Sequence, residues 1–109
     1  EGSGGILCPL RWDEKQELWL EDVIQELNLP CLVVADSGLG TINATLLTLE
    51  YLKSKHILTK GIILNHFHPE NEMEQDNRRM IEQKGHVPVV ACVPEGAGDI
   101  MVSIERILT

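Results

Sequence analysis

The sequence predicts an α/β fold built on a parallel β-sheet. Two observations lead to this prediction: three short runs rich in Val and Ile are apolar on consecutive residues, and amphipathic helical patterns alternate with them along the chain. Consecutive apolar residues suit strands that are buried on both faces, as in a parallel sheet. Strands and helices that alternate at this spacing indicate βαβ units with right-handed crossovers.

The three predicted strands are residues 31–35 (CLVVA), 61–65 (GIILN) and 88–93 (PVVACV). Three strands are few, since a mean sheet has about five or six. The stretch at 6–10 (ILCPL) is a candidate for one more short piece. We therefore expect residues 1–109 to be the C-terminal portion of a single larger α/β domain, with further strands supplied before Glu1.

Helical patterns flank these strands. Apolar residues with helical spacing predict helices near residues 20–27, 42–52 and 100–108. Trp12 and Trp19 precede the first of these helices, and we expect them to serve as core or interface anchors.

A fourth helix is predicted over residues 70–84, after Pro69. This stretch is mostly charged, so we expect an exposed helix with a solvated face. Its expected buried contacts are Met73, Met80 and Ile81.

The composition argues against several function classes. Seventeen acidic and nine basic residues give a formal net charge of −8, which disfavours binding to nucleic acid. No apolar run approaches the roughly 18 residues of a membrane helix, and no signal peptide is visible. The three cysteines form no C-x-x-C pair, and we expect Cys31 and Cys92 to be reduced core residues. We therefore expect a cytoplasmic protein without nucleic-acid or membrane partners.

Glycine-rich turns are predicted to gather at one edge of the sheet. The segments 36–43 (DSGLGTIN), 65–69 (NHFHP) and 94–98 (PEGAG) each follow a predicted strand. Parallel strands end at a common edge, where α/β proteins bind their ligands. Glycine lets a backbone approach a ligand, and a helix N-terminus favours anions. The alternative is ordinary turn chemistry, because no complete P-loop or dinucleotide motif is present.

Two other segments have more than one interpretation. The opening EGSGG has the composition of an expression linker, but it also suits a loop that handles phosphate and metal from Glu1 onward. In HFHPENE, His66 and His68 would share one face of an extended stretch, and Glu70 and Glu72 follow as further metal-binding types. We favour a helix start after Pro69 over a metal site there.

Several motifs, in order, resemble one enzyme family. EGSGGILCPL, LPCLVVADSGLGTINATLLTLEYLKSKHI, GIILNHFHPEN and VPVVACVP resemble the C-terminal half of dethiobiotin synthetases. That family typically shows V-E-G-A-G-G, L-G-T-I-N-H-T-L-L-T, G-x-x-x-N and V-P-V-L-G-x-x-P. The match covers nearly the whole chain, and LGTIN-x-T-LLT is its most specific part. The resemblance implies that EGSGG is the family's catalytic loop rather than a linker.

The resemblance also implies a fold and an activity. The fold is a P-loop NTPase-like, Rossmann-like three-layer arrangement, which here lacks its N-terminal P-loop half. The enzyme is a homodimer that uses ATP and Mg²⁺ to close the ureido ring of dethiobiotin from 7,8-diaminononanoate and CO2. The reaction passes through a carbamate and a carbamic–phosphoric anhydride. The P-loop, the catalytic lysine and a further metal-binding aspartate lie upstream of Glu1, so no catalytic residue is assigned here.

The binding residues implied by the resemblance fall into two sets. Glu1 is the metal ligand, Asn65 hydrogen-bonds the adenine, and His66 stands where Arg or Asp is common. The implied ATP-binding set is Glu1, Gly2, Ser3, Gly4, Asn65, His66, Pro94, Glu95 and Gly96. The second implied set binds the carboxylate of the substrate in the active site of the neighbouring subunit. It consists of Leu39, Gly40, Thr41, Ile42 and Asn43.

Two alternatives to a synthetase remain open at this point. One is a synthetase-like regulatory or ligand-sensing domain, such as that fused to phosphotransacetylases. The other is a non-enzymatic α/β interaction domain that begins with a genuine linker.

Overall fold

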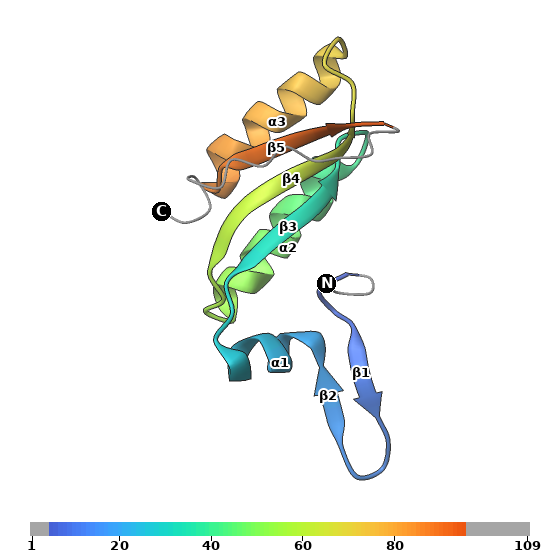
Figure 1. The fold of residues 1–109 in the computed structure, drawn as a ribbon, viewed down its shortest axis with the longest axis vertical. Coiled ribbons are helices and arrows are strands. Elements are labelled where there is room, and N and C mark those ends of the chain that lie inside the picture. Colours follow the sequence, from blue (N-terminus) through green and yellow to red (C-terminus); the bar gives the residue numbers. More distant parts are fainter. Residues whose placement is uncertain (1–4, 96–109) are drawn as a thin grey trace.

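The computed structural model describes residues 5–95, which form a three-stranded sheet, three helices and a separate hairpin (Figure 1). The predicted helix at 100–108 lies outside these residues. Along the chain the elements are β1 (Pro9–Trp12), β2 (Glu17–Trp19), α1 (Leu20–Leu27), β3 (Cys31–Asp36), α2 (Thr41–Ser54), β4 (Thr59–Phe67), α3 (Glu72–Gly85) and β5 (Val89–Pro94). No helix in this part of the chain is long and apolar enough to cross a bilayer.

The sheet has the strand order β3-β4-β5, and both pairings are parallel. Asp36 at the end of β3 pairs with Asn65 on β4, and Phe67 at the end of β4 pairs with Pro94 on β5. The three carboxyl ends therefore lie at one edge of the sheet (Figure 1). The predicted α/β fold with a parallel sheet is confirmed.

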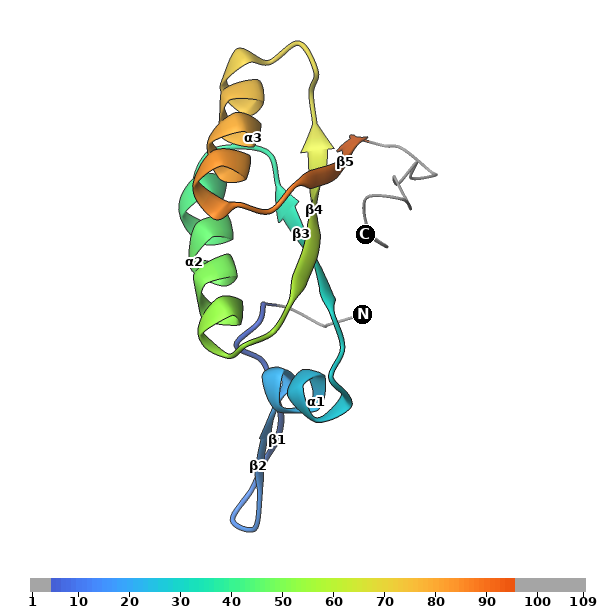
Figure 2. The same ribbon diagram turned by 90° about the vertical axis from the view of Figure 1, so that its left-hand side faces the viewer.

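The main core lies between the sheet and helices α2 and α3, which cover the same face (Figure 2). Apolar side chains from both helices meet three residues of β4 and the first residue of β5. The buried residues of this core cluster are Leu49, Ile62, Leu64, Phe67, Ile81 and Val89. Burial of this apolar surface is the main source of stability in such a layer.

The other face of the sheet has no described helix against it. β4 is still buried on both faces, because Ile63 packs with Val90 and Val93 on that side. β3 differs: its residues alternate between half-buried and exposed, and Val34 is 65% exposed. The expectation that β3 is buried on both faces is therefore wrong within residues 5–95, where β3 is an edge strand with one uncovered face. The described residues supply two layers of the expected three.

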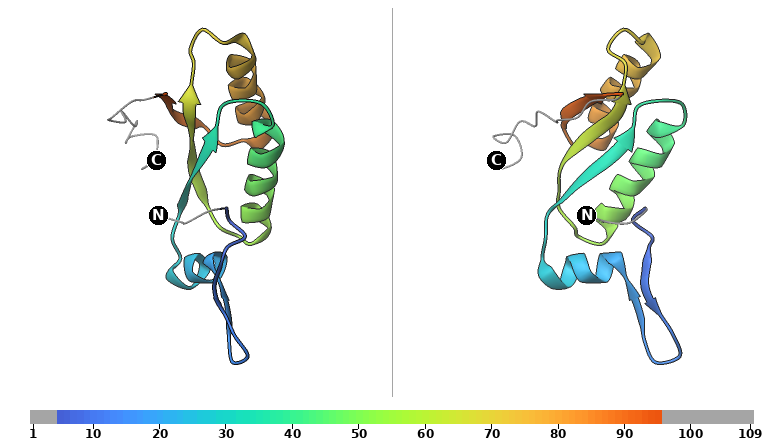
Figure 3. Two further views of the ribbon diagram at one scale, coloured as in Figure 1. Left: turned by 90° about the vertical axis from the view of Figure 1, so that its right-hand side faces the viewer. Right: turned by 45° about the vertical axis from the view of Figure 1, so that its right-hand side comes forward.

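The stretch expected as a piece of the main sheet forms a hairpin instead. β1 pairs antiparallel with β2, and this pair points away from the parallel sheet (Figure 3). Asp13 fixes the turn, because its Oδ1 accepts from the N–H groups of Lys15 and Gln16 at 2.8 Å. Trp12 and Trp19 pack edge to face with centroids 5.8 Å apart. Trp12 is exposed, so it is not a core residue, and its expected role as an interface anchor stays a prediction.

The cysteines form no disulfide within the described residues. Cys31 and Cys92 are half-buried rather than fully buried, and desolvation raises the pKa of both thiols. A raised pKa keeps a thiol protonated and unreactive near neutral pH.

Helix α3 buries polar side chains where methionines were expected. It begins at Glu72, and the N-cap residue Asn71 accepts a hydrogen bond from the N–H of Glu74 at 3.1 Å. The face toward the core carries Glu74, Asn77 and Ile81, all buried. Met73 and Met80 are exposed, so only Ile81 of the three expected contacts is correct.

Adjacent residues of α3 give a matched test of this orientation. Ile81 is fully buried and Met80 is 53% exposed. We expect Ile81→Ala to lower the free energy of unfolding by about 2–5 kcal/mol, because it leaves a cavity in the core. Met80→Ala should cost less than about 1 kcal/mol. Urea unfolding followed by circular dichroism measures both, and equal losses would contradict this orientation of α3.

Candidate functional site

The carboxyl edge of the sheet brings together segments that are far apart in the sequence. The hydroxyl of Ser37, after β3, donates to the carbonyl oxygen of Asn65 on β4 at 2.6 Å. His68, after β4, lies 3.0 Å from the carboxylate of Glu95, after β5. The predicted convergence of the three strand ends is confirmed for the described residues. Glu1, Gly2, Ser3, Gly4 and Gly96 lie outside them.

The N-terminus of α2 offers free backbone donors at this edge. Gly40 is the N-cap with φ of +86°, a left-handed conformation that glycine adopts without strain. No side chain caps the helix, and the N–H groups of Ile42 and Asn43 have no acceptor among the described residues. Free N–H groups and the helix dipole favour an anion at such a position. Leu39, just before it, is 94% exposed.

A buried polar network holds the loop that leads into α2. Thr41 Oγ1 donates to the carbonyl oxygen of Asp36 and lies 3.2 Å from Thr45 Oγ1. From α3, Asn77 Nδ2 donates to the carbonyl oxygens of Ser37 at 3.1 Å and Gly38 at 3.4 Å. These carbonyl oxygens of the loop therefore have hydrogen-bond partners. A buried carbonyl oxygen without a partner would lower the stability of the fold.

Asn77 was missed by the sequence analysis. Its signal was a polar residue at helical spacing within one stripe, three residues after Glu74 and four before Ile81. Such a residue is buried only where it has hydrogen-bond partners. The helix was interpreted as a solvated face, so this stripe was not sought.

Asn65 presents a carboxamide that is only partly engaged. Its Oδ1 accepts from the N–H of His66 at 3.0 Å, and its Nδ2 donates to no described residue. A carboxamide can donate and accept at once, so this side chain can still pair with a flat polar ring such as a purine. His66 is exposed with φ of +53°, and its Nδ1 lies 3.6 Å from Asp36 Oδ1.

His68 makes two hydrogen bonds to carboxylates from different elements. Its Nδ1 lies 3.0 Å from Glu74 Oε2, and its Nε2 lies 3.0 Å from Glu95 Oε2. The backbone N–H of His68 also donates to Glu74 Oε1 at 2.7 Å. The bonds to Glu74, and then to Glu95, raise the pKa of the imidazole above its usual value. The sequence analysis considered His68 only as a possible metal ligand.

Within residues 5–95, no group of three or more His, Cys, Asp or Glu side chains is arranged to hold a metal ion. In HFHPENE, His66 faces Asp36 while His68 faces Glu74 and Glu95, so the two imidazoles have different partners. The implied metal ligand, Glu1, lies outside the described residues.

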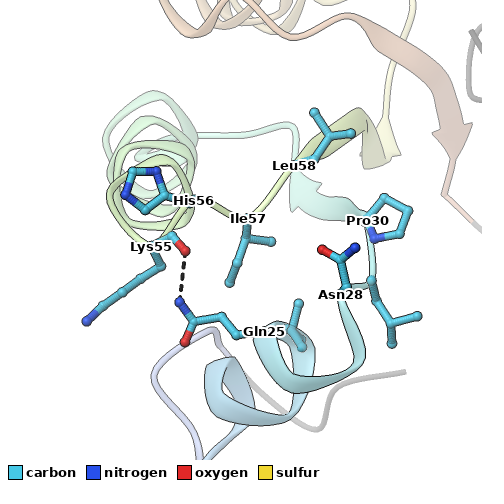
Figure 4. Close-up of a pocket in the computed structure, with 9 residues that line it drawn as sticks. Gln25, Asn28, Pro30, Lys55, His56, Ile57 and Leu58 are labelled. Atoms are coloured by element: carbon cyan, nitrogen blue, oxygen red, sulfur yellow. Dashed lines mark hydrogen bonds between the residues drawn. The ribbon is translucent and has the colours of Figure 1, made fainter.

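A hollow of about 440 Å³ lies at the opposite edge of the sheet, where the strands begin (Figure 4). Gln25 of α1 donates to the carbonyl oxygen of Lys55 across it at 2.8 Å. Its other lining residues are mostly apolar, and they include Ile24, Ile57 and Leu58. The hollow lies away from the converging loops, and it contains no buried polar group that lacks a partner.

The hydrogen bonds from Asn77 to the loop before α2 can be tested by replacing its donor group with an acceptor. Asn77→Asp places an acceptor against two carbonyl oxygens, so we expect a loss of about 1–3 kcal/mol in unfolding free energy at neutral pH. Burial would raise the pKa of the new carboxyl, so the loss should shrink as the pH falls and the carboxylic acid becomes a donor. Gln83→Glu, exposed on the same helix, is the control for added charge. A loss of unfolding free energy that does not depend on pH, or that equals the loss in the control, would contradict these hydrogen bonds.

Comparison with known proteins identifies the family. A family model described as an AAA domain matches residues 1–98. A relative named ATP-dependent dethiobiotin synthetase BioD from Brachyspira hyodysenteriae is 52% identical over 96 residues, which cover 88% of this chain and 43% of that protein. Proteins of the same name from Clostridium botulinum and Clostridium perfringens are 41% identical over 108 residues and 46% identical over 95 residues. These matches cover 99% and 87% of this chain, and 47% and 41% of those proteins.

The chain thus spans less than half the length of these curated relatives. Their name is that of an ATP-dependent ligase, and their matching region contains the segments that form the carboxyl edge. The chain belongs to the AAA domain family, and its resemblance to dethiobiotin synthetases is confirmed by curated relatives that bear that name.

Proposed function

We propose that the chain is the C-terminal portion of a single P-loop NTPase-like domain in an ATP- and Mg²⁺-dependent dethiobiotin synthetase. This enzyme closes the ureido ring of dethiobiotin from 7,8-diaminononanoate and CO2, and it works as a cytoplasmic homodimer. The observation that supports this best is that the uncapped α2 N-terminus and Asn65 lie at the same edge of the sheet, where Ser37 bonds to the backbone of Asn65. The relatives are named ATP-dependent dethiobiotin synthetases, and an edge of this kind suits the binding of ATP and of a carboxylate.

The adenine of ATP is proposed to bind at Asn65. The base presents a donor at N6 and an acceptor at N7, which match the carboxamide oxygen and the Nδ2 of Asn65. His66 adjoins this position, and Pro94 and Glu95 stand at the end of the neighbouring strand. Together with Gly96 they form the proposed nucleotide turn, to which Glu95 and Gly96 contribute backbone groups.

The carboxylate of diaminononanoate is proposed to bind at the N-terminus of α2. The N–H groups of Ile42 and Asn43 point to where an anion is favoured, and Gly40 leaves them open. The nearly complete exposure of Leu39 suits contact with a second chain. We therefore propose that residues 39–43 serve the site of the neighbouring subunit, so that each site needs both chains.

The chemistry requires positioning and charge neutralisation more than covalent catalysis. Mg²⁺ would neutralise charge on the phosphates, and Glu1 is the residue of this chain proposed to hold it, with Gly2, Ser3 and Gly4 behind. In the proposed route, CO2 adds to one amine of the substrate to give a carbamate. The carbamate takes the γ-phosphoryl group to become a carbamic–phosphoric anhydride, and the second amine closes the ring and expels phosphate. The phosphate-binding and catalytic lysines are expected from the preceding half.

The direct test of this function uses the full-length protein that contains this chain. It should release one phosphate per dethiobiotin formed from diaminononanoate, bicarbonate, ATP and Mg²⁺. Nucleotide binding without turnover would instead indicate the ligand-sensing alternative. Binding of neither nucleotide nor diamino acid would indicate an interaction domain.

Substitution of Asn65 should act on the nucleotide. We expect Asn65→Ala to raise KM for ATP about 5- to 100-fold, because a bidentate contact to a base is lost. KM for the diamino acid should change little, and discrimination between ATP and GTP should weaken. Asn65→Asp, which keeps the acceptor and removes the donor, should also bind ATP poorly. Steady-state kinetics of the full-length enzyme measure both values, and equal effects on both substrates would point to a structural role.

Substitution of Asn43 should act on the diamino acid and across the subunit interface. We expect Asn43→Ala, which removes the exposed carboxamide beside these N–H groups, to raise KM for diaminononanoate with ATP binding nearly intact. In dimers that mix Asn43→Ala subunits with Glu1→Gln subunits, one site carries both lesions and the other carries neither. Roughly half of the wild-type activity should return, since one of the two sites is intact.

Purified mixed dimers that are no more active than the average of their parents at low diaminononanoate would show that Asn43 serves its own subunit. A simple capping role would behave differently again. It would lower the stability by about 0.5–2 kcal/mol without a selective effect on either substrate.

A further inference from the structure

His68 connects the first turn of α3 to the segment after β5, which lie far apart in the sequence. It follows β4 in the chain, and its two ring nitrogens reach Glu74 on α3 and Glu95 just after β5. Each N···O distance is 3.0 Å, which is within the range of good hydrogen bonds. The imidazole therefore joins helix α3 to the start of the turn that follows β5.

The two bonds require a particular charge state. A carboxylate can only accept, and a neutral imidazole has a single N–H. Both bonds form together only when His68 carries a proton on each nitrogen, as an imidazolium between two carboxylates. Charge-assisted bonds of this kind are stronger than neutral ones.

The two carboxylates differ in how firmly they are held. The Glu74 side chain is only 6% exposed, and its backbone N–H is bound to the N-cap Asn71. The Glu95 side chain is 67% exposed, and its only described partner is His68. Glu74 therefore acts as the fixed anchor, and Glu95 is the group that is tethered to it.

We propose that His68 is a positioning residue for nucleotide binding, which holds Glu95, directly after β5, at a fixed distance from helix α3. The inference rests on the proposed function, because that function assigns Pro94, Glu95 and Gly96 to ATP. Asn65 lies three residues before His68 on the same stretch. One imidazole thereby fixes the spacing between the two segments proposed to contact the nucleotide.

A dependence on pH follows from this geometry. Glu74 of α3 and Glu95 after β5 are the titratable groups that act on His68, and both raise its pKa above the ordinary 6.5. The tether is therefore favoured on the acid side of this raised pKa, as long as both carboxylates stay ionised. It is lost as the pH rises through the raised pKa, because the neutral ring can serve only one carboxylate. Nucleotide affinity should fall over the same interval.

A double-mutant cycle in the full-length protein tests the tether. His68→Asn keeps a donor near Glu74 but is too short to reach Glu95, and Glu95→Ala removes the tethered group. We expect each variant to weaken binding of a fluorescent ribose-labelled ATP (mant-ATP) about 3- to 10-fold, and the double variant to be no weaker than either. KM for the diamino acid should change less than about 2-fold.

Two controls accompany the cycle. His86→Asn replaces an exposed histidine at the far end of α3, where φ is +56° and asparagine is tolerated, and it should bind mant-ATP as the wild type does. Measured against pH, the affinity of the wild type should show a step that His68→Asn lacks. The ionisation of ATP itself affects both proteins equally.

The outcomes separate the inference from the proposed function. If the wild type binds mant-ATP but forms no dethiobiotin, the proposed function is wrong and the cycle still decides the role of His68. If His68→Asn binds mant-ATP like the wild type, or if the two single effects multiply in the double variant, the positioning role is wrong. A wild type that binds no mant-ATP would overturn both.

Discussion

The parallel pairing of β4 with β3 on one side and β5 on the other is the constraint on which the proposed site depends. It forces three strand ends, and the loops after them, to one edge of the sheet. β4 can hold this central place because Ile62 and Leu64 fill the core under the helices while Ile63 packs on the opposite side. An edge strand such as β3 would not bring two flanking loops together.

Polar contacts between elements then fix the positions of the loops at that edge. Ser37 joins the loop after β3 to β4, Asn77 holds the same loop from α3, and His68 links α3 to the segment after β5. Each contact crosses between elements, so the loops are positioned by the helices as well as by the sheet. Ser37 and Asn77 are buried, and a lost bond there would leave a costly unpaired group.

The sequence predicted the elements better than it predicted their exposure. Runs such as GIILN identify a strand because apolar residues in sequence need two covered faces, and the glycine before Thr41 marks the start of α2. The exposure of Val34 depends on which layers lie against β3, and the sequence pattern does not contain that information. Met80 was expected to be buried because it is apolar, whereas burial follows the stripe that includes Asn77. Hydropathy alone assigns polar residues to the surface.

The candidate site was also predicted only in part from the sequence. Asn65 and the LGTIN segment were identified by motif, and their common edge follows from strand direction. The tether of His68 depends on distances between three segments, and no spacing in the sequence encodes it. The turn formed by Asp13 was also missed, since short polar hairpins lack a strong apolar alternation.

The most direct test is a crystal structure of the full-length protein with an ATP analogue, Mg²⁺ and diaminononanoate. The account predicts that adenine N6 and N7 lie about 3 Å from the carboxamide of Asn65. It also predicts that the substrate carboxylate lies on the N–H groups of Ile42 and Asn43 of the neighbouring subunit. A nucleotide bound in the hollow beside Gln25, or at any position away from the carboxyl edge, would contradict it.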